Sequence, residues 1–332
     1  MEISSGENPI DVVLPWVDGS DRLWQIEYQK HSNSKEFDAE RFRDWDNLKY
    51  VFRSIEKNMP WIRKVYFITA GHIPDFLNLN CNKLVHVKHA DYIPEEYLPT
   101  FNSHTIELNF HRISDLSENF IYFNDDTFAL NSIESEYFFK NNLPVDYMIM
   151  NPIYGGGIEH HLLRNICVIN RKFNNKYHLN TLKNLFRLDY GADLMRNLAL
   201  MPWKKYTGFY DPHSPLPYKK TTFKDVWDFE YSILDGSCIT KHRELTDVNQ
   251  YLFRYWRLCS GEFYNKNNKK FTCFISLQDD HINSAISIIK NNDKFKLLCL
   301  NDSGNISNFA KCKKEIIDAL DTRFPEKSIF EV

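Results

Sequence analysis

Two runs in the middle of the chain combine side chains that can carry out acid–base chemistry and bind a cation. His104, Glu107 and His111 recur at i, i+3 and i+7, so a helix would place all three on one side. Asp125 and Asp126 follow a continuous apolar, aromatic run, the pattern of a strand covered on both faces. Adjacent carboxylates repel each other unless a cation neutralises them, and Mg²⁺ or Mn²⁺ prefers such oxygen ligands. We therefore expect this pair to bind the metal; a solvated loop is the alternative that the residues alone leave open.

The elements around these residues predict an α/β fold. Their order is β-α-β-β-α-β, which predicts a Rossmann-like, mainly parallel sheet with helices packed on it. Ligands of such sheets bind just outside the carboxyl ends of the strands, which is where the two aspartates are expected. Strands are predicted over 10–17, 64–69, 84–88 and 120–123, and helices over 46–59 and from about 103 to 113.

Polar residues follow the first predicted strand and precede the first predicted helix. Gly19, between Asp18 and Ser20, would let a nucleotide approach the backbone, although a plain tight turn would look the same. The helix is preceded by two arginines and an aspartate: Arg41, Arg43 and Asp44. Free N–H groups at a helix N-terminus favour phosphate, so this is a candidate anion site. The arginines could equally pair with surface carboxylates.

The remainder of the chain carries further expectations. Residues 22–40 show no clear period and are predicted to be a surface excursion. Residues 171–205 are predicted to be a helical insert that covers the site and helps to choose the acceptor. Three prolines in 211–217 hold His213 on a constrained loop, although an isolated histidine is more often structural or merely exposed. Additional strands are predicted over 145–150, 166–169, 271–276 and 296–300, and a helix over 247–258.

Composition restricts the class of protein. The chain has 332 residues, of which 43% are hydrophobic and 15% aromatic, so it can build a substantial core. Its 41 basic and 44 acidic residues give a net charge of −3, which does not favour a nucleic-acid partner. The seven cysteines are scattered without a CxxC pair, which favours a reducing compartment. We find no leader pattern and no apolar run near the ~20 residues of a membrane helix, and expect a cytoplasmic protein.

Several motifs resemble one known family. LPTFNSHTIE (98–107) and LSENFIYFNDD (116–126) closely resemble the second conserved region of the Stealth proteins, bacterial sugar-1-phosphate transferases of capsule and cell-surface polysaccharides. The lysosomal-enzyme N-acetylglucosamine-1-phosphotransferase shares that region. DVVLPWVDGSD (11–21) resembles the first region, HSPLPYKK (213–220) the third, and Asn301-Asp302 the fourth. Because these regions span the chain, the resemblance implies one catalytic domain, residues 1–332.

The resemblance also implies roles for individual residues. RFRDWDNLKY (41–50) is similar to the family's RFRDNDELRY, which implies that Arg41, Arg43 and Asp44 belong to the active site. His213 and Arg243 match a histidine and an arginine retained together in the third region, although the family usually has an aromatic residue between two arginines there. The matched regions further imply substrate-binding positions at Trp16, Asp18, Gly19, Ser20, Asn102, Glu107, Asn124, Asn301 and Asp302.

Together these residues fit transfer from a nucleotide-sugar. Arg43 and Arg243 are candidate phosphate clamps, and Asp44, His104 and His213 are candidates for proton transfer. The residues alone do not separate attack on the anomeric carbon, which releases UDP, from attack on the β-phosphorus, which forms a phosphodiester and releases UMP. The resemblance implies the second, in a core of the GT-A-like plan. It also implies a UDP-N-acetylhexosamine or similar donor and a saccharide or lipid-linked oligosaccharide acceptor, on the cytoplasmic side of a bacterial membrane.

Three other functions remain open at this point. An ordinary metal-dependent glycosyltransferase would use the same residue types. A catalytically inactive polysaccharide-binding module would be expected to have lost some charged residues, whereas all of them stand. A metal-dependent phosphodiesterase would release sugar phosphate with water as the acceptor. A peripheral membrane or polysaccharide-assembly partner is also left open.

Overall fold

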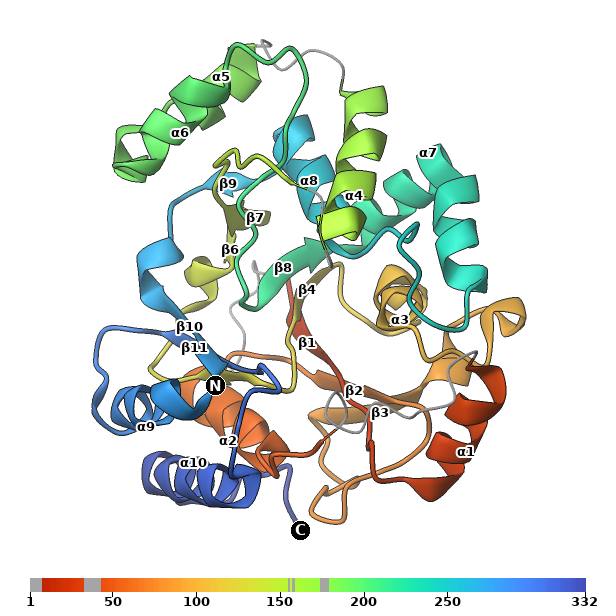
Figure 1. The fold of residues 1–332 in the computed structure, drawn as a ribbon, viewed down its shortest axis with the longest axis vertical. Coiled ribbons are helices and arrows are strands. Elements are labelled where there is room, and N and C mark those ends of the chain that lie inside the picture. The colour runs from red at the N-terminus through yellow and green to blue at the C-terminus, as the bar shows by residue number, and fades with distance from the viewer. Residues whose placement is uncertain (1–7, 33–42, 155, 157–158, 174–178) are drawn as a thin grey trace.

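The central sheet has five strands in the order β3-β2-β1-β4-β8. The computed structural model describes residues 8–32, 43–154, 156, 159–173 and 179–332. Four strands run parallel, and only β8 is antiparallel to its neighbour β4 (Figure 1). The strands are β1 (Ile10–Pro15), β2 (Val65–Thr69), β3 (Leu84–Lys88), β4 (Asn119–Tyr122) and β8 (Leu216–Lys219). The predicted mainly parallel α/β fold is therefore confirmed.

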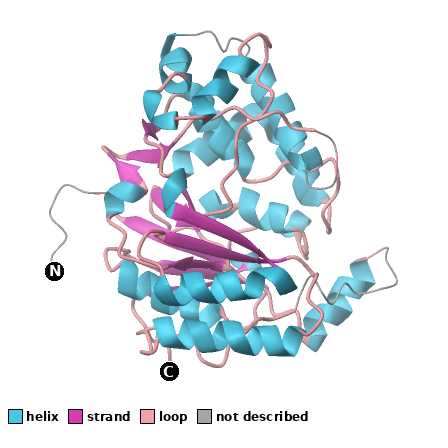
Figure 2. Ribbon diagram, turned by 60° about the vertical axis from the view of Figure 1, so that its left-hand side comes forward, coloured by secondary structure: helices cyan, strands magenta, loops and turns pink. Residues whose placement is uncertain are grey.

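Helices cover both faces of this sheet, so its central strands are buried on both sides. Val12 and Leu14 of β1 join one hydrophobic cluster, whereas Val13 between them joins the other. The first cluster is covered by α2 (Leu48–Asn58), α9 (Ile282–Asn291) and α10 (Phe309–Arg323). The second is covered by α3 (Ser103–Leu108), α4 (Glu159–Lys172), α7 (Lys220–Ile239) and α8 (Tyr251–Ser260). Figure 2 shows the strands enclosed between these helical layers.

Two small sheets extend the central one. In the first, β11 (Leu297–Asp302) lies between β10 (Thr272–Leu277) and β5 (Thr127–Ala129). Because β5 follows β4 after a short turn, this pairing brings the end of β11 toward the end of β4. The second sheet joins β6 (Phe139–Lys140), β7 (Leu143–Asp146) and β9 (Tyr264–Asn265).

Three sequence expectations about local structure are wrong. The segment from Arg22 to His31 is helix α1 rather than an irregular excursion, because Asp21 caps it by accepting from the N–H groups of Leu23 and Trp24. The apolar run 166–169 lies within α4 and is not a strand. The strand predicted over 145–150 ends at Asp146.

The remaining elements are short. Within 171–205 lie α5 (Leu179–Leu185) and α6 (Asp193–Leu200); whether this range is an insert in a single domain stays a prediction. The 3₁₀ turns are His89–Asp91, Glu95–Tyr97, Phe110–Arg112, Ser135–Tyr137, Leu188–Tyr190, Lys269–Phe271 and Asp279–His281. Within the described ranges, we find no helix with the length and apolar character needed to cross a bilayer.

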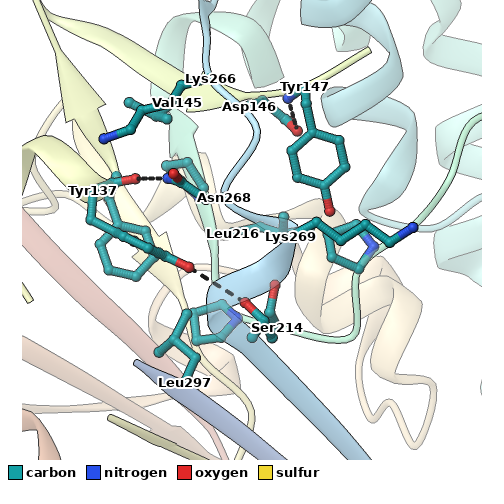
Figure 3. Close-up of a pocket in the computed structure, with 15 residues that line it drawn as sticks. Tyr137, Val145, Asp146, Tyr147, Ser214, Leu216, Lys266, Asn268, Lys269 and Leu297 are labelled. Carbon is teal, nitrogen blue, oxygen red and sulfur yellow. Dashed lines mark hydrogen bonds between the residues drawn. The ribbon is translucent and has the colours of Figure 1, made fainter. Parts of the chain in front are cut away.

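A buried charge network ties β7 to α8. Asp146 accepts from Arg254 at 2.8 Å and from Arg257 at 2.5 Å, and all three side chains are almost fully buried. Burial alone would raise the pKa of Asp146, but the two guanidinium groups outweigh it and lower the pKa. Arg254 also donates to Asp211 at 3.0 Å, which fixes the start of the loop that carries His213. Figure 3 shows Asp146 beside a crevice of about 30 Å³, which has room for about one water molecule.

We expect Asp146→Asn to lower the free energy of unfolding by about 3 kcal/mol or more, because it leaves two buried guanidinium groups without their shared counter-charge. Denaturant unfolding would measure this change. The control is Asp189→Asn, which breaks the exposed Arg187–Asp189 pair and should cost less than about 1 kcal/mol. Equal losses in the two variants would contradict the structural role assigned to Asp146.

Candidate active site

A cavity of about 490 Å³ lies at the carboxyl ends of β1, β4 and β11. This is the edge at which open α/β sheets bind their ligands, and the volume suits a small-molecule substrate. Residues from both halves of the chain meet there: Trp16 after β1, Asn124 after β4, and Asn301 at the end of β11. The segment before α2, the first turns of α3 and Arg243 complete the wall.

Asp125 and Asp126 line this cavity, at the end of β4 where the sequence placed them; that they bind a metal stays a prediction. Burial, and then the charge of Asp126, raise the pKa of Asp125 to about 7. Asp126 accepts from the Thr127 hydroxyl at 3.0 Å and from the Cys299 thiol at 3.5 Å, and burial raises its pKa as well. A cation would relieve the cost of ionising both groups.

The pair fits the ligand set of Mg²⁺ or Mn²⁺. Such ions are often held by one or two carboxylates, with water and substrate phosphates supplying the other ligands. Across the described residues, no group of three or more His, Cys, Asp and Glu side chains is placed to hold a metal. A cation here would therefore depend on this pair and on oxygen atoms from outside the protein.

Arg43 lines the cavity and is held by Asp302. Its Nε and Nη2 atoms each donate to the Asp302 carboxylate at 2.5 Å, and Trp45 Nε1 donates to the same group at 2.8 Å. Burial would raise the pKa of Asp302, but the Arg43 hydrogen bonds outweigh it and the pKa falls. Asp302 thus orients the guanidinium group of Arg43. The ring of Phe309 also packs on this group, with its centroid 4.5 Å from Cζ of Arg43.

Glu107 is a buried carboxylate on the wall of the cavity. Its side chain accepts from the Tyr122 hydroxyl at 3.1 Å, and the residue is only 8% exposed. Burial raises its pKa to about 7, while the charge of Arg243 opposes that shift. Arg243 is itself exposed and donates to the Ser103 hydroxyl at 3.1 Å. A carboxyl group with a pKa near neutrality can both accept and return a proton.

Asp44 also lines the cavity, on the side of the α2 N-terminus. It accepts from the backbone N–H of Asp46 at 2.8 Å, and partial desolvation, aided by the Asp46 charge, raises its pKa. Arg41, predicted beside it, lies outside the described residues. Arg43 and Asp44 are therefore the members of that motif that the structure places in the cavity.

His104 and Asn102 lie behind the cavity wall, buried against Asp247. Asn102 donates to the Asp247 carboxylate at 2.8 Å, and His104 Nδ1 lies 3.3 Å from it. His104 packs on the ring of His161, and burial lowers its pKa to about 4. Asn102 also donates to Thr240, so the cluster supports the segment that carries Arg243.

The expected single polar helix face is wrong. Helix α3 ends at Leu108, and His111 lies in the 3₁₀ turn that follows, against the rings of Phe223 and Trp227. Of the three side chains expected on that face, only Glu107 reaches the cavity.

Two further predicted positions lie beside the cavity and do not line it. The turn from Asp18 to Ser20 closes on itself, because Asp18 accepts from the Ser20 N–H at 2.8 Å and from its hydroxyl at 2.6 Å. His213 is exposed, and its ring contacts the ring of Phe274 in a tilted arrangement with the two centroids 4.6 Å apart. Burial lowers the pKa of His213, and the Asp126 charge opposes the shift, so the loop lies near the carboxylate pair.

Sequence reasoning missed several residues of the wall. Tyr122 was assigned only to a buried strand, yet it is the last residue of β4 and its hydroxyl reaches Glu107. A tyrosine among phenylalanines and isoleucine was the signal, because its hydroxyl needs a partner when buried. Trp24, Trp45, Thr100, Phe101 and Ser103 also line the cavity.

Comparison with known proteins identifies the family to which this chain belongs. Family descriptions of Stealth protein conserved regions 1 and 2 match residues 8–36 and 41–146. A capsular polysaccharide phosphotransferase, WcwK, of Streptococcus pneumoniae is 40% identical over 97% of this chain and 98% of its own length. The chain belongs to the Stealth family. The predicted family is therefore confirmed.

Further polysaccharide phosphotransferases align over nearly the whole chain as well. The receptor polysaccharide phosphotransferase WefC of Streptococcus gordonii is 33% identical, covering 97% of this chain and 99% of its own. Among solved structures, a mutant of LgtC matches with a TM-score of 0.39 and 10% identity, over 93% of this chain and 95% of LgtC. Because that score is low, the assignment of the fold rests on the sheet order described above.

We expect Glu107→Gln to stabilise the protein as the pH rises. The folded state keeps Glu107 protonated up to a pKa of about 7, whereas the ordinary pKa of a glutamate side chain is 4.5. A carboxyl group whose pKa is raised by folding lowers the free energy of unfolding as the pH rises from its ordinary pKa to its folded pKa. The complete loss is about 3 kcal/mol. The variant escapes this cost, so its free energy of unfolding should exceed that of wild type above about pH 7 and approach it near pH 4.5.

Chemical denaturation across this pH range would measure the difference, with Glu134→Gln at an exposed position as the control. The charge of Arg243 opposes this shift of the Glu107 pKa, and so do hydrogen bonds from Tyr122, Ser103 and the backbone of Gln250, but burial outweighs them. A difference between wild type and Glu107→Gln that does not change with pH would show that Glu107 is not buried as described.

Proposed function

We propose that this Stealth protein transfers hexose-1-phosphate, with N-acetylhexosamine-1-phosphate as the first candidate, from a UDP-sugar to a saccharide hydroxyl. The names of its relatives support phosphotransfer in the synthesis of capsular and other surface polysaccharides. The UDP-sugar donor, the release of UMP and a cytoplasmic site of action are our inference. One observation carries the proposal: a single cavity holds a carboxylate pair, two guanidinium groups and a protonatable buried carboxyl group.

In this reaction a hydroxyl oxygen of the acceptor attacks the β-phosphorus of the donor. A new phosphorus–oxygen bond forms, the bond from the β-phosphorus to the bridging oxygen breaks, and UMP leaves with the electron pair. The acceptor proton passes to a carboxylate of the protein. The product is a phosphodiester between the sugar and the acceptor.

Arg43 and Arg243 are proposed to bind the phosphates. Arg43 is pre-oriented by Asp302, so little side-chain entropy is lost when a phosphate binds. Arg243 reaches the cavity from the other half of the chain. Asp125 and Asp126 would hold Mg²⁺ or Mn²⁺, which, when bound, offsets the negative charge of the pyrophosphate.

The proton acceptor is proposed to be Glu107 or Asp44. Both line the cavity, and the pKa of each is raised toward the range in which a carboxylate can take a proton from a hydroxyl. His213 is the weaker candidate, because it does not line the cavity. His104 is proposed to position the Arg243 segment, through Asp247, rather than to transfer protons.

The expected by-product is UMP. We would incubate the protein with Mg²⁺ or Mn²⁺, a panel of UDP-sugars and candidate saccharide acceptors, and separate UMP from UDP. UMP that appears only with an acceptor would support sugar-1-phosphate transfer and identify the donor. UDP would instead indicate attack on the anomeric carbon, and free sugar phosphate formed with water alone would indicate a phosphodiesterase.

Asp126→Asn should lower kcat/KM by about 100-fold or more, because it removes one of two charged oxygen ligands proposed to hold the cation. The remaining activity should need a higher Mg²⁺ concentration, which a metal titration would measure. Asp75→Asn, at an exposed position away from the cavity wall, is the matched control. Normal turnover with unchanged metal dependence in Asp126→Asn would remove the metal assignment.

A further inference from the structure

The segment 179–205 forms a helical hairpin whose outer side is unusually apolar. It comprises α5, the 3₁₀ turn Leu188–Tyr190, α6 and the turn up to Lys205. Figure 1 shows α5 and α6 near each other at the end of the molecule opposite α10. Its large exposed side chains are Leu188 (91% exposed), Met195 (67%), Leu179 (65%), Trp203 (56%), Leu198 (45%) and Phe186 (39%).

The inner side of this hairpin is well packed, so the outer side is exposed on a fixed structure. Asn197 accepts from the backbone N–H of Met150 at 2.7 Å and donates to the carbonyl of Leu185 at 2.7 Å. The hydroxyl of Tyr190 donates to Asn265 at 2.9 Å. Exposure of such large apolar side chains on a fixed element marks an interaction surface.

The charge around these side chains is positive, although the whole chain has a net charge of −3. The hairpin's two acidic side chains are paired, Asp189 with Arg187 at 2.9 Å, and Asp193 with Arg196 at 3.6 Å and with Lys269 at 3.0 Å. Its five basic side chains are Lys183, Arg187, Arg196, Lys204 and Lys205. The surface therefore presents apolar and tryptophan side chains surrounded by an excess of cations.

We propose that the hairpin docks this protein on a bilayer that contains anionic lipids. Leu188, Met195 and Trp203 would enter the boundary between head groups and acyl chains, which apolar and tryptophan side chains favour. Lys183 and Lys204 are exposed and would face the anionic head groups, each strengthening binding by about fivefold. A bilayer supplies both the extended apolar layer and the negative surface that this combination needs.

The hairpin is linked to the active-site wall through α4. At one end of α4, Asn170 accepts from the backbone N–H of Tyr206, just after the hairpin, at 2.9 Å. At the other end, His161 packs on His104 of α3, the helix that carries Glu107. The fourteen residues of α4 span roughly 20 Å, so the docked cavity would lie about one helix length from the lipid surface. The docking surface does not depend on the proposed transfer reaction.

Flotation with phospholipid vesicles tests the proposal on the full chain. We expect wild type to float with vesicles of phosphatidylcholine and phosphatidylglycerol, to bind pure phosphatidylcholine much less, and to be released by high salt. Two variants should each weaken binding to the mixed vesicles by about tenfold or more: L188S/M195S/W203S and K183E/K204E. The matched control, L79S/K314E, changes an exposed leucine and an exposed lysine elsewhere on the surface and should bind as wild type does.

Several results would overturn the proposal. These results are wild type that stays unbound in the presence of mixed vesicles, hairpin variants that both bind as wild type does, and a control that loses binding equally. If wild type does not bind vesicles but sedimentation shows dimers that are absent in L188S/M195S/W203S, the surface is instead an interface between two copies. UMP formation with a soluble saccharide acceptor should be unchanged in all variants, so a failure of docking is distinguishable from a failure of the proposed function.

Discussion

Repulsion among carboxylates is the constraint on which the candidate site depends. Among the residues that the structure describes, the cavity wall gathers five of them but two guanidinium groups: Asp44, Glu107, Asp125, Asp126 and Asp302 against Arg43 and Arg243. Asp302 is satisfied by Arg43, whereas the pKa values of the other four are raised mainly by burial. An arrangement of this kind binds cations and protons readily, and it is held in place only because the surrounding structure is rigid.

That rigidity comes from the central strands. β1 and β4 are adjacent and are packed on both faces, so the residues that follow their ends have little freedom. The pairing of β5 with β11 then brings Asn301 and Asp302 to the same edge from nearly two hundred residues further along the chain. The site is consequently a product of long-range strand pairing, and no single segment of the sequence contains it.

The sequence predicted those parts of the fold whose pattern is set by burial. β3 was predicted with the bounds that the structure has, and β2 and α2 within about two residues, because continuous apolar runs and an apolar stripe reflect contact with the core. The strand predicted over 166–169 was wrong because a short apolar run fits a buried helix as well as a strand. Helix α1 was not predicted because it buries none of its residues, so no apolar stripe marks it in the sequence. The Asp21 cap stabilises its start instead.

The predicted site residues differ in the same way, in whether a local pattern determines their position. Asp125, Asp126, Arg43 and Asp44 line one cavity. The end of a buried strand indicated where the two aspartates lie, whereas the family resemblance implied the place of Arg43 and Asp44; the roles of all four stay predictions. His104 was misplaced because spacing along a helix shows which residues share a side, but not which neighbour that side meets. Its actual partner, Asp247, is 143 residues away, and nothing local to either residue indicates the contact.

The cluster around Asp247 has a consequence for how this protein can change over time. One buried carboxylate accepts from Asn102, from Thr240 and from the backbone N–H of Glu244, and it lies against His104. Replacing Asp247 alone removes the acceptor that these groups share, while a joint replacement of the partners need not leave any of them unsatisfied. Substitutions here are therefore strongly epistatic: the segment bearing Glu107 and the segment bearing Arg243 are expected to diverge as one unit. Exchanging either segment alone between distant relatives would break the contact that aligns them.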